Sequence, residues 1–95
     1  MNLLTKEIRK EIPLIGSQDQ ETDPIAHVKF FCPWNSWTWY ATEFDGEDIF
    51  FGKVIGFETE LGSFSLSELQ NVIGPAGITI ERDIHFSPKP LSECK

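Results

Sequence analysis

The chain has 95 residues, 40% of them hydrophobic, which is enough for one modest core and leaves no room for a second domain. It carries 15 acidic and 8 basic residues, and this excess of negative charge argues against direct binding to nucleic acid, which requires a basic patch. No apolar run reaches the roughly 18 to 20 residues that cross a bilayer. The first residues also lack the features of a secretory signal, so we expect a cytoplasmic protein that is not embedded in a membrane.

The first predicted element is a short helix that Thr5 caps and Pro13 ends. Leu4, Ile8 and Ile12 recur every four residues and therefore share one face. Because a helix of about two turns is not stable alone, we expect this face to dock on the rest of the fold.

Three strands are predicted in the middle of the chain, where β-branched and aromatic residues are concentrated. They cover residues 25–32, 37–44 and 49–58. The turn signal Asp45-Gly46-Glu47-Asp48 separates the last two strands, which should therefore pair antiparallel. Gly52 and Gly56 share one face of the third strand and are typical of β-bulges or of places where another backbone or a ring packs closely.

Alternation predicts which side chains of the first two strands share a face. In the first strand the expected core face consists of Ala26, Val28, Phe30 and Cys32. In the second strand one face carries Trp37, Trp39, Ala41 and Glu43. The other face of that strand carries Thr38, Tyr40, Thr42 and Phe44.

Further elements are predicted after these strands. They are a turn at residues 60–62, a short strand over 63–66 and a helix over 68–73. Ser65 or Ser67 caps this helix, and Gly74-Pro75 ends it. Partial alternation within residues 78–86 predicts a final edge strand.

These elements together predict an α+β fold. We expect a small antiparallel β-meander of about four to five strands, with a short N-terminal helix and a second short helix packed on it. One domain covers residues 1–95. The polar residues 16–24 predict a flexible exposed loop, and the prolines near the end predict a flexible tail over 88–95 that carries Cys94.

A run of carboxylates is the first feature that can carry chemistry, since clustered carboxylates can hold a hard cation. The run consists of Glu43, Asp45, Glu47 and Asp48. It lacks the EF-hand spacing and lies between strands, so a solvated hairpin turn is favoured, and no metal or other cofactor is predicted. The two cysteines have no CxxC spacing, and in the cytosol both are expected to be reduced thiols.

Trp37, Trp39 and Tyr40 form the most prominent aromatic feature of the sequence. Two tryptophans at positions i and i+2 of a strand project from the same face. They can pack in the core, or they can stack on a base, a sugar or a peptide side chain. Core packing is the commoner use of such residues, and Trp37, next to the turn, is the one best placed to bind at the surface.

His27, His85 and Arg82 are the remaining candidates. Neither histidine has the spacing of a metal or catalytic motif, so both are expected at sheet edges or on the surface. Arg82 lies between Glu81 and Asp83. An ion pair within the sheet therefore explains Arg82 as well as a role in binding an anion does.

Six segments, in order along almost the whole chain, resemble the bacterial family catalogued as domain of unknown function 2958. They are residues 3–9, 28–31, 37–48, 50–52, 64–69 and 80–83. The stretches WTWYATEFDGED and ERD are the most specific of them. The resemblance implies a short stand-alone protein of a kind often carried on plasmids and other mobile elements. It supplies no catalytic residues to carry over, because the family has no established activity.

The leading hypothesis is a non-enzymatic module that binds another protein, in particular a basic nucleic-acid-handling one, through an acidic surface that carries aromatic side chains. The formal charge of -7 and the neighbouring aromatic and acidic segments favour it. On this hypothesis, the double substitution Asp45→Lys and Asp48→Lys should weaken partner capture and leave folding intact. The protein would be a monomer, or a homodimer formed by strand addition at a sheet edge.

Two alternatives stay open. A small enzyme or a ligand-binding domain for a polar substrate would bring Glu43, Arg82 and His85 together in one cleft. A single-stranded nucleic-acid binder would use Trp37 and Trp39 as stacking platforms, and the negative charge of the chain disfavours it.

Overall fold

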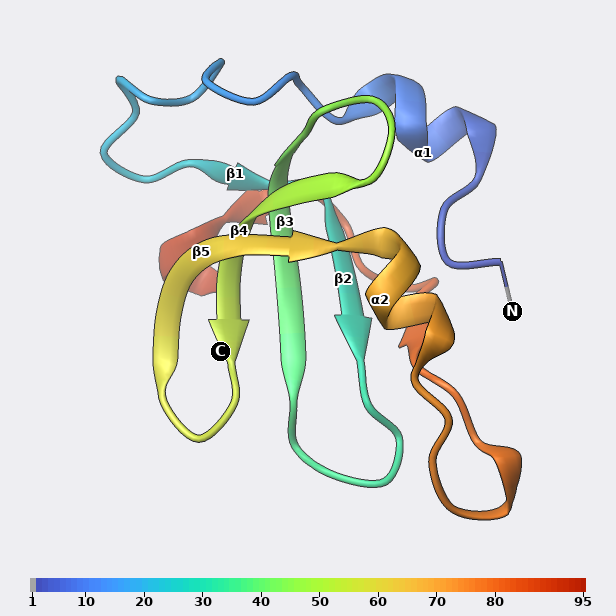
Figure 1. Cartoon of the computed structure of the whole chain (residues 1–95). Helices are drawn as coiled ribbons and strands as arrows, with labels where there is room; N and C mark the ends of the chain where they lie inside the picture. Colours follow the sequence, from blue (N-terminus) through green and yellow to red (C-terminus); the bar gives the residue numbers. More distant parts are fainter. Residues whose placement is uncertain (1) are drawn as a thin grey trace.

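The centre of the fold is an antiparallel sheet of five strands in the order β5-β4-β3-β2-β6 (Figure 1). The computed structural model that shows it describes residues 2–95. The strands are β2 (Val28–Phe31), β3 (Thr38–Phe44), β4 (Ile49–Ile55), β5 (Thr59–Ser65) and β6 (Glu81–Arg82). The predicted α+β meander is therefore confirmed.

Short helices and two further strands surround this sheet. They are α1 (Lys6–Glu11), β1 (Ile25–Ala26), α2 (Leu66–Asn71), η1 (Pro75–Gly77), β7 (Lys89–Pro90) and η2 (Leu91–Glu93). The side chains of Thr5 and Ser65 cap α1 and α2, as the sequence predicts. None of the helices in residues 2–95 combines the length and the apolar character needed to cross a membrane.

The main core lies on the face of the sheet against which α1 and α2 pack, called here the helix face. Its centre is the fully buried Phe50. The ring centroid of Phe50 lies 4.5 Å from that of Phe44, 5.3 Å from that of Phe64 and 5.4 Å from that of Phe30. The predicted apolar stripe of α1 docks on the same core, and it consists of Leu4, Ile8 and Ile12.

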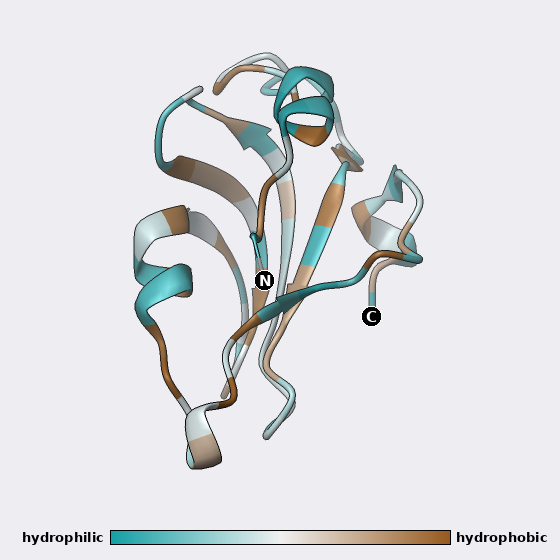
Figure 2. Cartoon of the chain, turned by 90° about the vertical axis from the view of Figure 1, so that its right-hand side faces the viewer, coloured by the Kyte–Doolittle hydropathy of each residue, from teal (hydrophilic) through white to brown (hydrophobic). Residues whose placement is uncertain are grey.

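The opposite face of the sheet, called here the tail face, is covered by the C-terminal segment. Figure 2 shows the sheet edge-on, with α2 on one side and the C-terminus on the other. Leu91 and Cys94 are buried there in a second small core. The Nζ atom of Lys53 donates a hydrogen bond to the Cys94 carbonyl oxygen at 2.7 Å. Cys94 therefore does not lie in a mobile tail, because these apolar side chains have the tail face to pack against.

Ala26 is a second departure from the predicted pattern. The extended segment bends at His27, whose N–H donates to the Ala41 carbonyl oxygen at 2.8 Å. β1 thereby leaves the main sheet and pairs with β7. Ala26 packs in the tail-face core, whereas Val28 faces the helix-face core as predicted.

A β-bulge at Thr42 changes the faces assigned to the end of β3. The register shifts between Ala41 and Glu43, so Thr42 has no partner across the β3–β4 ladder. Its hydroxyl instead donates to the Phe51 carbonyl oxygen at 3.0 Å. The extra residue moves Glu43 to the tail face and Phe44 to the helix face, the reverse of the prediction.

The hairpin between β4 and β5 closes earlier than predicted. The turn lies at residues 56–58, and residues 60–62 belong to β5. Gly56 lets the Trp37 ring pack against the start of this turn, because a Cβ atom there would press into that ring. Of the alternatives that the sequence left open for Gly56, the close packing of a ring is the one observed, and the predicted turn at 60–62 is wrong.

Candidate interaction surface

The acidic turn between β3 and β4 is organised by its own carboxylates. One oxygen of Asp45 accepts hydrogen bonds from the N–H groups of Glu47, Asp48 and Ile49, at 2.8, 2.8 and 3.1 Å. These bonds, with the Glu47 N–H first, lower the pKa of Asp45. The side chain of Asp45 is thus used in holding the turn.

Asp48 joins the same turn to the start of α2. Its carboxylate accepts hydrogen bonds from the Ser65 hydroxyl at 2.6 Å, and from the Ser67 N–H and hydroxyl at 2.8 and 3.0 Å. The Ser65 hydroxyl is the main cause of the lowered pKa of Asp48. The double substitution of Asp45 and Asp48 by lysine is therefore expected to disturb the turn and the helix cap, so it does not test binding separately from folding.

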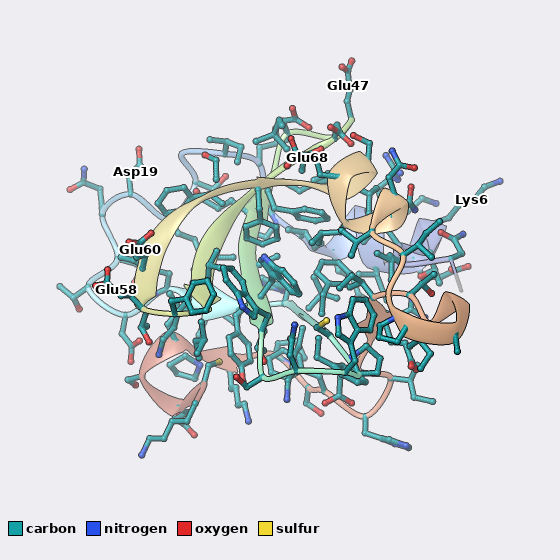
Figure 3. The ribbon with its side chains drawn as sticks, turned by 60° about the horizontal axis from the view of Figure 1, so that its bottom comes forward. Lys6, Asp19, Glu47, Glu58, Glu60 and Glu68 are labelled. Carbon is teal, nitrogen blue, oxygen red and sulfur yellow. The ribbon has the colours of Figure 1, made fainter. Side chains whose placement is uncertain are left out.

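Asp48→Asn is expected to lower the free energy of unfolding near neutral pH, because an amide is a weaker acceptor than a carboxylate. Since the pKa of Asp48 is lowered in the folded state, its stabilisation is present above the ordinary pKa of 3.8 and is lost as pH falls through the lowered value. Urea unfolding of both proteins across this range should show the difference shrinking toward acid pH. Glu47→Gln is the matched control, since Glu47 extends away from the molecule (Figure 3).

Glu43 is a buried structural carboxylate. It is 3% exposed, and its Oε2 atom accepts a hydrogen bond from the Gln18 N–H at 2.6 Å. The Gln18 side chain in turn donates to the Thr42 and Ile25 carbonyl oxygens and accepts from the Ile25 N–H. Most of the loop over residues 16–24 is exposed as predicted, and Gln18 fastens it to the end of β3.

Arg82 and His85 lie away from Glu43. The Nη1 atom of Arg82 donates to the Asn2 and Leu3 carbonyl oxygens at 2.9 and 3.0 Å, which fastens the N-terminal segment to β6. His85 is exposed in the segment after β6. The cleft that an enzyme built from Glu43, Arg82 and His85 requires is not formed. Within residues 2–95, no group of three or more His, Cys, Asp and Glu side chains is placed to hold a metal ion.

The predicted aromatic residues divide between the two faces of the sheet. Tyr40 is buried on the tail face, where its hydroxyl donates to the Lys95 carbonyl oxygen at 3.1 Å. Burial is the main cause of the raised pKa of Tyr40. Trp37 and Trp39 lie together on the helix face, each half-buried, with ring centroids 6.0 Å apart. Only the two tryptophans are therefore available to a binding surface.

An exposed aromatic surface forms where the β4–β5 hairpin turns. Phe57 is 96% exposed, and the Trp37 ring meets it edge-on with centroids 5.5 Å apart. A shallow hollow of about 270 Å³ lies between them. Its lining, called here the hairpin-tip surface, consists of Trp37, Val54, Phe57, Glu58 and Glu60.

The acidic residues of the hairpin-tip surface are not the ones predicted. Glu58 and Glu60 lie on the same side of the molecule as β5, whereas Glu47 lies elsewhere (Figure 3). The sequence did not indicate Phe57, Glu58 and Glu60 as binding residues. The predicted turn at residues 60–62 assigned Phe57 to a strand. A large apolar residue between Gly56 and two glutamates is the local signal that could have revealed this turn.

Comparison with known proteins identifies the family of this chain but does not assign it a function. Residues 3–94 match the model of the family described as Protein of unknown function (DUF2958). Neither the curated proteins nor the solved structures contain a significant match. Since the family match covers almost the whole chain, the protein belongs to the DUF2958 family.

Proposed function

We propose that this protein is a non-enzymatic interaction module that binds a basic protein partner through the hairpin-tip surface. The observation that carries the proposal is Phe57, an almost fully exposed phenylalanine beside the half-buried Trp37. Because Phe57 is almost fully exposed, it buries little area in the fold, and its side chain is available as an anchor. Aromatic side chains that enter a pocket of a partner supply a large share of the binding energy at protein interfaces.

Charge selects the class of partner. Glu58 and Glu60 flank the aromatic side chains, and the chain as a whole has a formal charge of -7. Such a surface attracts a basic protein and repels an acidic one during encounter. Nucleic-acid-handling proteins carry basic surfaces. Because the family resemblance implies a protein of a kind often carried on mobile elements, the nucleic-acid-handling proteins encoded on such elements are the first partners to test. An accessory role on a mobile element is part of this proposal.

Phe57→Ala is expected to lower partner capture by about tenfold or more, the effect of losing an interface anchor. The measurement is an affinity pull-down with the tagged protein from lysate of its host, treated with nuclease, with the bound proteins quantified by mass spectrometry. Ile73→Ala is the matched control, because Ile73 is also largely exposed, at 74%, and lies outside the hairpin-tip surface.

Charge reversal tests the acidic part of the same surface. Glu58→Lys combined with Glu60→Lys should abolish capture of a basic partner, whereas Glu47→Lys, in the distant β3–β4 turn, should change it little. Glu47, Glu58 and Glu60 are all exposed, so circular dichroism and thermal unfolding of these variants should resemble those of the wild type. A partner that binds the Phe57 and Glu58/Glu60 variants as well as the wild type would show that another surface is used.

A further inference from the structure

The backbone of β5 forms an open edge of the sheet. β5 is the last strand in the sheet order, and within the described residues it pairs with β4 alone. The Gly56 N–H donates to the Glu58 carbonyl oxygen at one end of this ladder, and the Leu66 N–H donates to the Asp48 carbonyl oxygen at the other. Between these two bonds, successive residues of β5 direct their N–H and C=O groups alternately toward β4 and away from it. It follows that the N–H and C=O groups of Thr59, Leu61 and Ser63 turn away from β4. Ser65, the fourth residue in this alternation, is the N-cap of α2.

This edge lacks the protection that natural sheets usually give an edge strand. Edge strands are commonly short or interrupted by lysine or proline. The other edge of the sheet follows that rule, since β6 has only two residues. β5 has seven residues, and none of them is lysine or proline. Its first three residues, 59–61, are all exposed. Its outward N–H and C=O groups can pair with another extended segment.

We propose that β5 accepts an extended segment of the partner as an added strand. The proposal rests on the proposed function and specifies how the partner is bound. In an added strand, the backbone pairs with the edge and alternate side chains point to opposite faces of the sheet, where pockets select them. The surroundings of β5 provide such pockets on both faces.

On the helix face, the hollow beside β5 is the hairpin-tip surface. The side chains of Trp37, Phe57, Glu58 and Glu60 meet there. A lysine or arginine fits this combination, because its alkyl stem can lie on the aromatic rings while its charged group reaches the carboxylates.

On the tail face, two neighbouring hollows of about 490 and 260 Å³ border the same strand and share Pro24 and Leu61. Leu61 is 65% exposed, and the larger hollow is mainly apolar because Leu91 also lines it. An apolar side chain of the added strand would cover Leu61. Asp19 lines the smaller hollow and lies on the same side of the molecule as Glu58 and Glu60 (Figure 3). The segment that fits therefore alternates basic and apolar residues.

A second copy of this chain fits the edge less well than a basic segment. Each copy has a formal charge of -7, and pairing two β5 strands would bring Glu58 and Glu60 of both copies to one interface. Like charges placed close together at an interface oppose association.

The test uses a synthetic peptide of about seven residues that alternates lysine and valine, titrated into the isotope-labelled full chain and followed by NMR. The amides of Thr59, Leu61 and Ser63 are expected to shift and to gain protection from hydrogen exchange. Those of Glu60, Gly62 and Phe64 should change less, because they already face β4. The same peptide with glutamate in place of lysine is expected not to bind.

Ser63→Pro is the variant that separates backbone pairing from side-chain contacts. Its N–H points away from β4, so proline removes a donor of the free edge and leaves the ladder intact, and the preceding Gly62 tolerates a following proline. Binding of the lysine-valine peptide should weaken at least about tenfold. Ser63→Ala is the control and should bind as the wild type does.

Each contrary outcome is decisive. Unchanged peptide binding by Ser63→Pro, or the absence of the alternating protection pattern in the wild type, overturns the strand-addition proposal. If Phe57→Ala still lowers capture of the cellular partner, the proposed function stands without it. Equal binding of the glutamate peptide overturns the basic character of the segment. A concentration-dependent dimer that Ser63→Pro dissociates would show that the edge pairs with a second copy, and this also overturns the proposal.

Discussion

Gly52→Ala is expected to destabilise the protein by about 3 kcal/mol or more, or to prevent folding, because it forces overpacking against a neighbouring backbone. A Cβ atom at Gly52 would press into the Tyr40 carbonyl oxygen and lie 2.9 Å from its carbonyl carbon. These are backbone atoms of β3, the strand next to β4, so no side chain can rotate to make room. Urea unfolding followed by tryptophan fluorescence measures the loss.

Gly62→Ala is the matched control for Gly52→Ala. Gly62 lies directly opposite Gly52 in the β4–β5 ladder, yet no heavy atom lies within 4 Å of a Cβ built there. Its substitution should change the free energy of unfolding by no more than about 0.5 kcal/mol. Equal effects at the two glycines would mean that the strand pairing, and not the close approach of β3, limits this position.

Phe50→Ala is expected to cost about 3 to 5 kcal/mol of folding free energy, through lost burial and the cavity left behind. Phe50 is fully buried and lies between the rings of Phe44 and Phe64, with Phe30 packed at an angle beneath. No single neighbour can fill the space, because each of these rings is held by its own strand. The midpoint of urea unfolding should fall accordingly.

Phe57→Ala is the control for Phe50→Ala, since it removes the same group from an almost fully exposed position. Its free energy of unfolding should stay within about 0.5 kcal/mol of the wild type. The pair thus separates two roles of phenylalanine in one hairpin, since loss of Phe50 is expected to lower stability and loss of Phe57 is expected to weaken the proposed partner binding. A Phe57→Ala protein as unstable as Phe50→Ala would place Phe57 in the core and would remove the basis of the proposed function.

Features that depend only on residues close together in the chain were predicted correctly from the sequence. Thr5 and Ser65 cap the two helices, because a capping side chain needs only the N–H groups one turn further on. Residues 45–48 form the turn between β3 and β4, where Gly46 has a φ of +92°, a conformation that glycine adopts readily. For Gly52 the sequence left a bulge, a neighbouring backbone or a ring as alternatives, and the structure shows a neighbouring backbone.

Face assignments failed where one residue disturbed the strand period. The bulge at Thr42 exchanges the faces of Glu43 and Phe44, and the bend at His27 sends Ala26 to the tail face. Alternation assumes an unbroken strand, and a one-residue shift reverses every side chain beyond it. Neither Thr42 nor His27 is a glycine or a proline, so the sequence carries no local signal of the bulge or the bend.

The sequence by itself determined the fold class, the middle strands with the turn at 45–48, the helix caps and the family, because these depend on local chemistry or on order along the chain. Only the tertiary structure decided that the second hairpin turns at residues 56–58, that Phe57 is exposed beside Trp37, and that Asp45 and Asp48 are engaged in structural hydrogen bonds. The tail-face core around Cys94 belongs to the same group. The hydrogen bonds of Asp45 stay within its own turn. The other features depend on contacts between segments far apart in the chain, and those contacts are settled by packing across the sheet.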